Sequence, residues 1–315
     1  MRITVAICTL DRAESLRLTL GSLAAMTVPG DVEWEVVIVN NGCRDHTDEV
    51  VQSFAEKLPV RREFEEKRGH SHARNRAVDA AKGDYIVWTD DDVLVEPGWL
   101  AAYAEAFRRW PDAAVFGGRI IPRYEMPVVE WVAQCEELLA SPYAVRDFGD
   151  QALPLSIVEG RLPYGANFAL RSAEQRKFRY NPELGLSPSR RRLGDETNVI
   201  ERILRSGATG YWVPKSGVQH RITHDRQTVA YIARYFAGLG ETQALLAGRG
   251  AAAPQWFGAP RWLWRRLIGE WLRYRLHRLI SPAPVWLAQL RDYSLTRGAI
   301  RYWRLAASGE AGGEC

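Results

Sequence analysis

The sequence predicts an α/β fold with a mostly parallel central sheet, followed by amphipathic helices in the C-terminal part. Three observations support this prediction. Short apolar segments alternate with segments of helical periodicity through most of the chain. One apolar segment, residues 85–89, runs directly into three consecutive aspartates. Residues 261–305 are rich in arginine and tryptophan at helical spacing. Alternating strands and helices favour a parallel sheet with helices on both faces.

Length and composition set the class of protein. A chain of 315 residues can form one large domain with a helical addition. The four cysteines are scattered without metal-binding spacing, so we expect reduced thiols in a cytosolic protein. The first residues show no signal-peptide pattern, and no apolar run reaches the ~18 residues of a membrane span. We therefore expect a cytoplasmic protein.

The first half of the chain reads as regular alternation. The apolar run 2–8 predicts the first strand, and leucines at helical spacing predict a helix at 15–25 that ends before Pro29-Gly30. Residues 34–40 form a second apolar run that ends in Asn-Asn-Gly, a favoured turn. We predict further elements in this order: helix 47–57, strand 60–64, helix 71–81, central strand 85–89, helix 98–110 and strand 113–121.

The second half is less regular. We predict, in order, helix 128–140, strand 165–170, helix 194–206, strand 210–214 and helix 227–247. Residues 248–260 are rich in Ala, Gly and Pro, which is typical of a linker. The sequence thus divides into a body at 1–247, a linker at 248–260 and a basic helical tail at 261–315.

Three carboxylates, Asp90, Asp91 and Asp92, directly follow the central strand. They are expected at the carboxyl edge of the sheet, where open α/β sheets bind their ligands. Like charges at consecutive positions repel one another, and burying them unpaired is costly. A bound Mg²⁺ or Mn²⁺ removes that cost and typically joins carboxylates to substrate phosphates. The alternative interpretation is a solvated turn ahead of Pro97.

Six motifs of the chain fall in a fixed order. They are CTLDR (8–12), VIVNNGCRDHT (37–47), RGHSHARNRAVDAAKGDYIVWTDDD (68–92), GANFALR (165–171), GDETNVIERILRSG (194–207) and VPKSGVQHRITHDR (213–226). No G-x-G-x-x-G follows the first strand, which disfavours a dinucleotide-binding fold. The order of the six motifs resembles that of the family-2 glycosyltransferases of the GT-A type, over roughly residues 1–247. The resemblance implies a GT-A catalytic domain at 1–247 that makes bacterial polysaccharide or cell-surface glycan with inversion.

The resemblance also implies that a nucleoside diphosphate sugar lies across the strand ends. Asn40 and Asn41 stand where the family commonly has aspartates, one of which contacts uracil. An asparagine carbonyl can still accept from the uracil imide, whereas its amide can face other bases, so UDP is expected but the base stays open. Capped turns and an arginine–aspartate ion pair are the alternative interpretations. The implied donor-binding residues are Thr9, Asp11, Arg12, Asn40, Asn41, Arg74, Asp90, Asp91, Gly165 and Asn167.

The resemblance assigns the metal and the base to other residues. Asp92 matches the aspartate of the DxD motif that coordinates the metal, and His220 matches a histidine that reaches the metal or the diphosphate. Mn²⁺ or Mg²⁺ there would stabilise the leaving diphosphate. Glu196 matches the catalytic base, with Asp195 as second choice. The alternative is that these two acids only favour the start of a helix through its dipole.

The tail carries a strong positive charge. Residues 261–305 contain ten arginines, against Glu270 and Asp292. This composition is typical of an interfacial helix on an anionic membrane, and an ordinary packed helix is the alternative. No nucleic-acid motif accompanies the charge, so nucleic acid is not expected as a partner. On a helical wheel one broad face contains Leu263, Trp264, Leu267, Ile268, Trp271, Tyr274 and Leu279, and the opposite face contains Arg265, Arg266, Arg273 and His277.

Together these observations predict a metal-dependent, inverting hexosyltransferase that is peripheral on the inner face of the plasma membrane. It would move a sugar from a nucleotide-diphosphate donor, with UDP expected, to a hydroxyl of a glycan or lipid-linked acceptor. Two other functions stay open. One is a catalytically inactive membrane scaffold that binds nucleotide sugar. The other is a nucleotidyltransferase, which is disfavoured because CTLDRAESL lacks the glycines of its usual loop.

Overall fold

The structure is a computed structural model that describes residues 1–188, 190–248 and 254–308. Residues 249–253 of the predicted linker lie outside the described residues. The same holds for residues 309–315 of the predicted tail, including Cys315.

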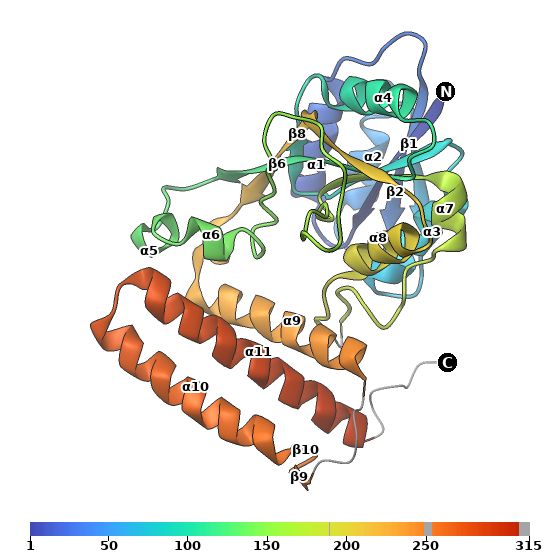
Figure 1. The fold of residues 1–315 in the computed structure, drawn as a ribbon. Helices are drawn as coiled ribbons and strands as arrows, with labels where there is room; N and C mark the ends of the chain where they lie inside the picture. The colour runs from blue at the N-terminus through green and yellow to red at the C-terminus, as the bar shows by residue number, and fades with distance from the viewer. Residues whose placement is uncertain (189, 249–253, 309–315) are drawn as a thin grey trace. The chain divides into compact units, whose positions relative to one another are not determined.

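An eight-stranded mixed sheet forms the core of the first part of the chain (Figure 1). Its strand order is β3-β2-β1-β4-β7-β6-β8-β5. The first four strands in that order pair in parallel, whereas β7 is antiparallel to β4 and β6, and β5 is antiparallel to β8. The predicted α/β class is confirmed. The strands are β1 (Arg2–Thr9), β2 (Glu33–Asn40), β3 (Val60–Phe64), β4 (Tyr85–Thr89), β5 (Val93–Val95), β6 (Val115–Tyr124), β7 (Asn167–Arg171) and β8 (Gly210–Ile222).

Helices cover both faces of this sheet, as the alternating pattern predicts. Tyr85 and Val87 of the central strand β4 belong to one buried cluster with side chains of α1, α2 and α4. Ile86 and Trp88 belong to a second cluster with side chains of α3 and α8. Successive strand residues point to opposite faces, so a fully buried strand needs an unbroken apolar run. The helices are α1 (Ala13–Ala24), α2 (Thr47–Gln52), α3 (His70–Ala80), α4 (Trp99–Arg109), α7 (Ser172–Lys177) and α8 (Asp195–Arg205).

The parallel register brings three polar strand ends to one edge of the sheet. Thr9 at the end of β1 lies opposite Asn40 at the end of β2. Ala6 of β1 lies opposite Trp88 of β4, so Asp90 follows at nearly the same level. The carboxyl ends of parallel strands meet at one edge, and this is where the candidate site is found.

The chain separates into two compact units. The first comprises Met1–Arg123, Tyr143–Pro188 and Asp195–Arg221 and holds the sheet. The second comprises Tyr124–Pro142, Ser189–Gly194 and Ile222–Cys315. It includes α9, which the sequence places in the body. The second unit contains α5 (Glu130–Ala133), α6 (Glu136–Leu139), a short 3-10 helix (His224–Gln227), α9 (Val229–Ala247), α10 (Arg261–Ile280) and α11 (Ala283–Ala307).

Within the second unit, α11 packs against both α9 and α10. Glycines allow the closest approach between α9 and α11. A Cβ atom at Gly298 would lie 1.9 Å from the carbonyl oxygen of Ala237, and one at Gly240 would lie 2.1 Å from that of Leu295. Glycine inside a helix costs about 1 kcal/mol relative to alanine, and here it permits backbone contact. None of the described helices is long and apolar enough to cross a membrane.

Several elements differ from the prediction. The helix expected at 128–140 is two short helices, α5 and α6, and nothing in the local sequence explains the break. The strand expected at 210–214 continues through Pro214 to Ile222. Its partner β5 pairs only with residues 218–220, so the missing N–H of Pro214 costs no hydrogen bond on that side. The prediction also missed β5 and α7, and the linker contains a two-residue strand pair, β9 (Gln255–Trp256) and β10 (Ala259–Pro260).

The predicted single apolar face of the first tail helix is wrong. Leu263 of α10 is buried in one cluster with Ile300 of α11, and Leu267 packs against that cluster. Ile268 and Leu279, expected on the same face, are 58% and 83% exposed. The helix is apolar on two sides. The wheel interpretation missed the second side because it left out leucines that point away from α11.

Candidate active site

The acidic segment after β4 is held by one arginine from the loop after β1. Arg12 Nη1 lies 2.7 Å from Asp91 Oδ1, and its Nη2 lies 2.8 Å from Asp92 Oδ2. The hydroxyl of Thr9 donates to the other oxygen of Asp91 at 2.7 Å. Both carboxylates are buried. The predicted residues Thr9, Arg12, Asp91 and Asp92 therefore come together, as the parallel register requires.

Burial raises the pKa of Asp91 to about 6, and the charge of Asp92 adds to the effect while Arg12 opposes it. The positive charge of one arginine thus does not fully compensate the carboxylates. A second cation near the two carboxylates would add to the effect of Arg12 and lower the pKa of Asp91 from this raised value. The donor set of buried carboxylate oxygens is the kind that Mg²⁺ and Mn²⁺ prefer.

The β5–β8 pairing brings a histidine beside these acids. Val93 lies opposite His220 in the two-stranded register, and the main-chain N–H of Arg221 donates to the carbonyl of Asp92 at 3.0 Å. His220 Nδ1 lies 2.5 Å from the carbonyl oxygen of Tyr143, which assigns the proton to Nδ1. His220 Nε2 then faces Asp92 Oδ1 at 3.4 Å. Two electron-pair donors that face each other, one of them oriented by a carbonyl, fit a divalent cation.

A second arginine, Arg74 of α3, joins this acidic segment to the start of α8. The Arg74 side chain is buried, with its guanidinium 5.3–5.7 Å from the ring centroids of Trp88, Phe168 and Tyr180. Its nitrogens lie 3.8 Å from an oxygen of Asp90, 3.1 Å from Asp195 and 3.5 Å from Glu196. Arg74 therefore contacts three predicted site residues.

Asp195 and Glu196 occupy the first turn of α8 and differ in environment. Burial acts to raise the pKa of Asp195, yet the nearby Arg74 and His70 hold it well below its usual range. Burial and the charge of Asp195 raise the pKa of Glu196 to about 7. Two adjacent carboxyl groups with pKa values pushed apart are a common arrangement for acid–base chemistry. Glu196 is the group suited to accept a proton near neutral pH.

Gly165, just before β7, leaves room for this pair. A Cβ atom at this position would lie 2.9 Å from Arg74 Nη2 and 3.3 Å from Glu196 Cδ. The glycine of the GANFALR motif thus lies against Glu196 and Arg74.

Asn40 and Asn41 lie at the predicted sheet edge, but their side chains are engaged in hydrogen bonds with groups of the protein itself. Asn40 Oδ1 accepts from the N–H groups of Gly42 and Cys43, and its Nδ2 donates to Asp48. Asn41 Nδ2 donates to the carbonyls of residues 65 and 67, and its Oδ1 accepts from the N–H of residue 69. These contacts shape the turn after β2 and hold it to the loop before α3.

Asn167 points into the protein interior. Its Oδ1 accepts from the indole of Trp99 and the hydroxyl of Tyr103, both at 2.8 Å. Its Nδ2 donates to the carbonyls of Arg119 and Ser216. The amide makes four hydrogen bonds to α4, β6 and β8, so its side chain is not brought together with the other predicted residues.

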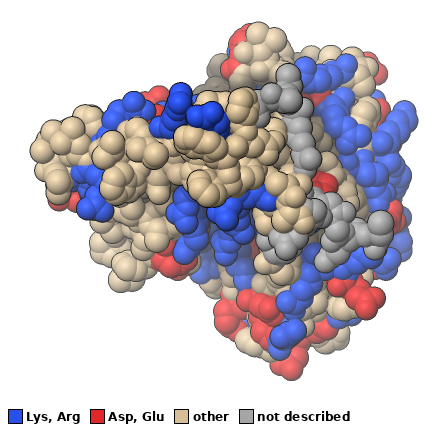
Figure 2. Space-filling model, turned by 90° about the horizontal axis from the view of Figure 1, so that it is seen from below, with Lys and Arg blue, Asp and Glu red and all other residues tan. Residues whose placement is uncertain are grey.

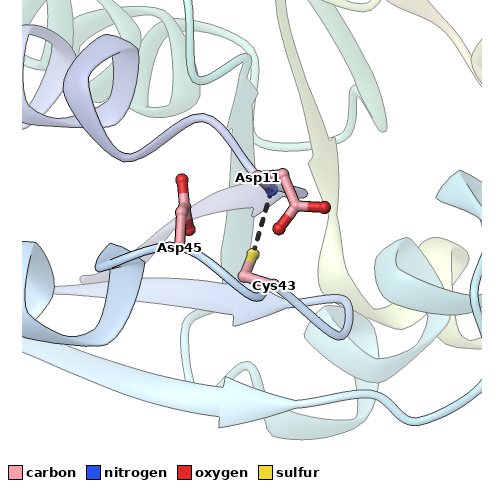
Figure 3. A group of neighbouring side chains, drawn as sticks. All are labelled: Asp11, Cys43 and Asp45. Atoms are coloured by element: carbon pink, nitrogen blue, oxygen red, sulfur yellow. Dashed lines mark hydrogen bonds between the residues drawn. The ribbon is translucent and has the colours of Figure 1, made fainter.

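Asp11 belongs to a small cluster with Cys43 and Asp45, shown in Figure 3, whose ligand atoms lie within 4.8 Å of one another. The main-chain N–H of Asp11 donates to the sulfur of Cys43 at 3.3 Å, and its carboxylate accepts from the N–H of Arg44. Asp45 accepts from the N–H of Ala13 and from Thr47. Burial raises the pKa of the Cys43 thiol, which keeps it protonated. The cluster joins the loop after β1 to the turn after β2, and its donors suit that role better than metal binding.

Sequence reasoning missed His70. Its Nδ1 lies 3.3 Å from Asp195 Oδ2. His70 and Arg74 are four residues apart at the start of α3, so they lie on one helix face. That spacing within RGHSHARN was the available signal.

Solved structures with the same fold bind nucleotide sugars. The chain aligns with the mannosyltransferase PcManGT from Pyrobaculum calidifontis in complex with GDP-Man and Mn²⁺, with a TM-score of 0.58, 19% identity, and coverage of 99% of this chain and 76% of that one. It also aligns with S. aureus TarS 1-349 in complex with UDP, with a TM-score of 0.56, 15% identity, and coverage of 98% and 92%. The chain thus shares the GT-A fold of these two structures.

Sequence comparisons point to one family. The chain is 28% identical over 181 residues to the glucosyl-dolichyl phosphate glucuronosyltransferase of Haloferax volcanii, covering 54% of this chain and about half, 53%, of that protein. It is 26% identical over 254 residues to the succinoglycan biosynthesis protein ExoM of Rhizobium meliloti, covering 78% and 75%. Residues 4–149 match the family model described as Glycosyl transferase family 2. These matches support a glycosyltransferase of this family, and they agree with the resemblance drawn from the six motifs.

Proposed function

We propose that this glycosyltransferase is metal-dependent and inverting, and that it moves a hexose from a nucleotide-diphosphate donor to an acceptor hydroxyl. The observation that carries the proposal is the arrangement of two carboxylate pairs at one sheet edge. Arg74 lies within 4 Å of both acids of the second pair and of Asp90, the residue just before the first pair. One pair has the donors for a cation, and the other holds a group with a pKa of about 7. Such a site supports a single in-line displacement.

At the first pair, Asp92 and His220 would hold the metal. When bound, Mn²⁺ or Mg²⁺ supplies positive charge for the leaving diphosphate. Arg12, which contacts Asp91 and Asp92, keeps both carboxylates oriented. The half-exposed Asp90 is then available to the ribose hydroxyls. These assignments retain the roles that the motifs imply.

At the second pair, Glu196 would act as the general base. The acceptor oxygen forms its bond to the anomeric carbon as the bond from that carbon to the diphosphate breaks, and the hydroxyl proton passes to a carboxylate oxygen of Glu196. The configuration at the anomeric carbon is inverted, because the two oxygens lie on opposite sides of the carbon. Asp195 stays ionised beside Arg74 and holds the pKa of Glu196 high enough to accept the proton.

For the nucleotide-sugar donor, which we expect to be a UDP-sugar, we retain the predicted neighbours Thr9, Asp11, Arg12, Arg74 and Gly165. Asn40 and Asn41 would contribute through the shape of the turn that their side chains hold together. Asn167 would contribute by fixing the start of β7. Solved structures of this fold carry GDP-Man, UDP and UDP-GlcNAc, which supports a nucleotide-sugar donor and leaves the choice of base to experiment.

For the acceptor we propose a lipid-linked or cell-surface glycan, with the enzyme in the cytoplasm and peripheral on the inner face of the plasma membrane. The support is the arginine-rich, tryptophan-rich helix α10 and the names of two relatives. One is a glucosyl-dolichyl phosphate glucuronosyltransferase, and the other takes part in succinoglycan biosynthesis.

The test is isothermal titration of UDP, GDP and dTDP into the protein, each with Mn²⁺ and with EDTA. We expect one diphosphate to bind only with metal, and Asp92→Asn to abolish that binding. Asp79→Asn, an exposed aspartate of α3 that pairs with Arg179, is the matched control and should bind as the wild type does. If none of the three nucleotides binds to folded protein, the proposed donor chemistry is wrong.

A further inference from the structure

Helix α10 presents a second apolar side that does not face α11. The side toward α11 carries Leu263 and Leu267, which pack near Ile300, and Tyr274, which stacks on Tyr293 of α11. Residues at these spacings lie on one helix face. The opposite face is therefore turned away from the helix pair.

That outward face has an apolar stripe. Ile268, Leu272, Leu276 and Leu279 are 58%, 55%, 54% and 83% exposed. Steps of four, four and three residues place them along one side of the helix. Single exposed apolar side chains need no explanation, but four in line on one helix form an exposed apolar surface of the kind found at binding sites.

The charge around the stripe has one sign. Arg265, Arg273 and Arg275 are exposed on α10. The only acid of the helix, Glu270, is 2% exposed and accepts from Arg266 at 2.7 Å. The exposed surface of α10 thus carries arginines and no carboxylate. In Figure 2, uncharged side chains gather on the left, where α10 lies in Figure 1, with Lys and Arg among them.

We propose that the outward face of α10 binds the surface of an anionic phospholipid bilayer. The leucine stripe enters the boundary between headgroups and acyl chains, and the arginines bind the lipid phosphates. The helix lies in the plane of the surface, which agrees with the absence of a membrane-spanning segment among the described helices. This inference deepens the proposed function: it rests on the membrane location proposed there and adds which residues of α10 make the contact.

A second copy of the chain is a poorer occupant of this face. Two-fold pairing would set the arginines of one α10 against those of the other. The exposed residues of α10 include no carboxylate to separate them. Lipid phosphates supply the negative charge that such a pairing lacks.

The test is co-sedimentation of the whole protein with phosphatidylcholine vesicles and with vesicles in which about a third of the lipid is phosphatidylglycerol. We expect binding to the anionic vesicles and little to the neutral ones. The double variant Leu272→Glu with Leu276→Glu should lower the partition coefficient about 100-fold, since each leucine loses its burial. The double variant Arg265→Gln with Arg275→Gln should lower it about 25-fold, about fivefold for each charge.

Helix α1 offers matched controls in the other unit. Leu18 is 47% exposed and the Arg17 side chain is 44% exposed. Leu18→Glu and Arg17→Gln should leave vesicle binding unchanged. Equal binding to both kinds of vesicle, or equal loss in the α1 controls, overturns the proposal.

Sedimentation velocity without lipid tests the alternative occupant. A concentration-dependent dimer that the Leu272→Glu and Leu276→Glu changes abolish overturns the lipid proposal in favour of self-association. Metal-dependent nucleotide binding is measured on the same variants. If nucleotide binding is retained while vesicle binding fails, only the membrane proposal is wrong. If nucleotide binding fails in the wild type and in all variants, the proposed donor chemistry is wrong.

Discussion

The two carboxylate pairs of the site are built from the same kinds of side chain but balance their charge differently. At the end of β4 one arginine, Arg12, reaches both acids with nearly equal contacts, 2.7 Å to Asp91 and 2.8 Å to Asp92. This arginine is partly open to solvent, with 38% of its side chain exposed. This arrangement suits the cation site proposed above.

At the start of α8 the buried Arg74 serves a pair unequally. Asp195 has both Arg74 and His70 within 3.3 Å, so it lies closer to basic side chains than Glu196 does. Glu196 is left with a pKa of about 7. An equal division of charge fits the proposed cation site, and an unequal one fits the proposed base. The following experiments test that difference.

The largest effect is expected at the base. Glu196→Gln should lower kcat about 10²–10⁴-fold, the usual contribution of a general base. Donor binding by titration should be unchanged, because the amide keeps the size of the side chain. Glu201→Gln, on the same helix and paired with Arg205, is the control and should stay active. Retained transfer in Glu196→Gln would end its assignment as the base and restore Asp195 as the candidate.

The buried arginine comes next. Arg74→Ala leaves Asp195 and its neighbours without their main cation, and breaking such a buried pair costs about 3–5 kcal/mol of unfolding free energy. Denaturant unfolding measures the loss. Arg76→Ala, two residues along α3, removes an exposed pair with Glu63 and should cost about 0–1 kcal/mol. Equal losses in the two variants would contradict the central place given to Arg74.

The pH profile sharpens the comparison further. Because Glu196 must be ionised to accept a proton and its pKa is raised to about 7, kcat/KM should rise with pH and level off above about pH 7. Asp195→Asn removes a neighbouring negative charge and frees Arg74, so the rising limb should move to lower pH. A limb that stays in place or moves to higher pH would show that Asp195 does not set the pKa of the base.

The smallest effect is expected at the equally shared pair. Arg12→Gln should lower the unfolding free energy by about 1 kcal/mol without metal, since the arginine is partly exposed. Added Mn²⁺ should narrow the gap to wild type, because a cation held by Asp92 and His220 would replace part of the positive charge that Arg12 supplies. Arg62→Gln, of similar exposure and paired with Asp48, should show no such rescue.

Most of the first unit could be predicted from the sequence, because buried strands need continuous apolar runs. Residues 85–89 show this, since their side chains belong to clusters on both faces of the sheet. The three-residue β5 could not be predicted, because three residues give no periodicity and its pairing with β8 lies more than a hundred positions away. The same pairing places His220 beside Asp92, so that contact was accessible only through the motif resemblance.

Side-chain direction limited the prediction of the site. A motif places Asn40 and Asn167 near the strand ends but does not say which hydrogen bonds their amides make. In Asn40 they close a turn, and in Asn167 they bind the interior. His70 shows the converse, because a residue without an assigned role contacts Asp195 through simple helix spacing. The outward leucines of α10 were missed because α11 fixes which side of the helix is covered.

Asn167 also bears on how the sheet is completed during folding. Its four partners lie 48 to 68 residues away in the chain, on α4, β6 and β8. A buried amide without these partners is costly, so β7 is less stable on β4 until they are in place. The antiparallel half of the sheet should therefore form cooperatively, and the edge of β4 stays unpaired until it does.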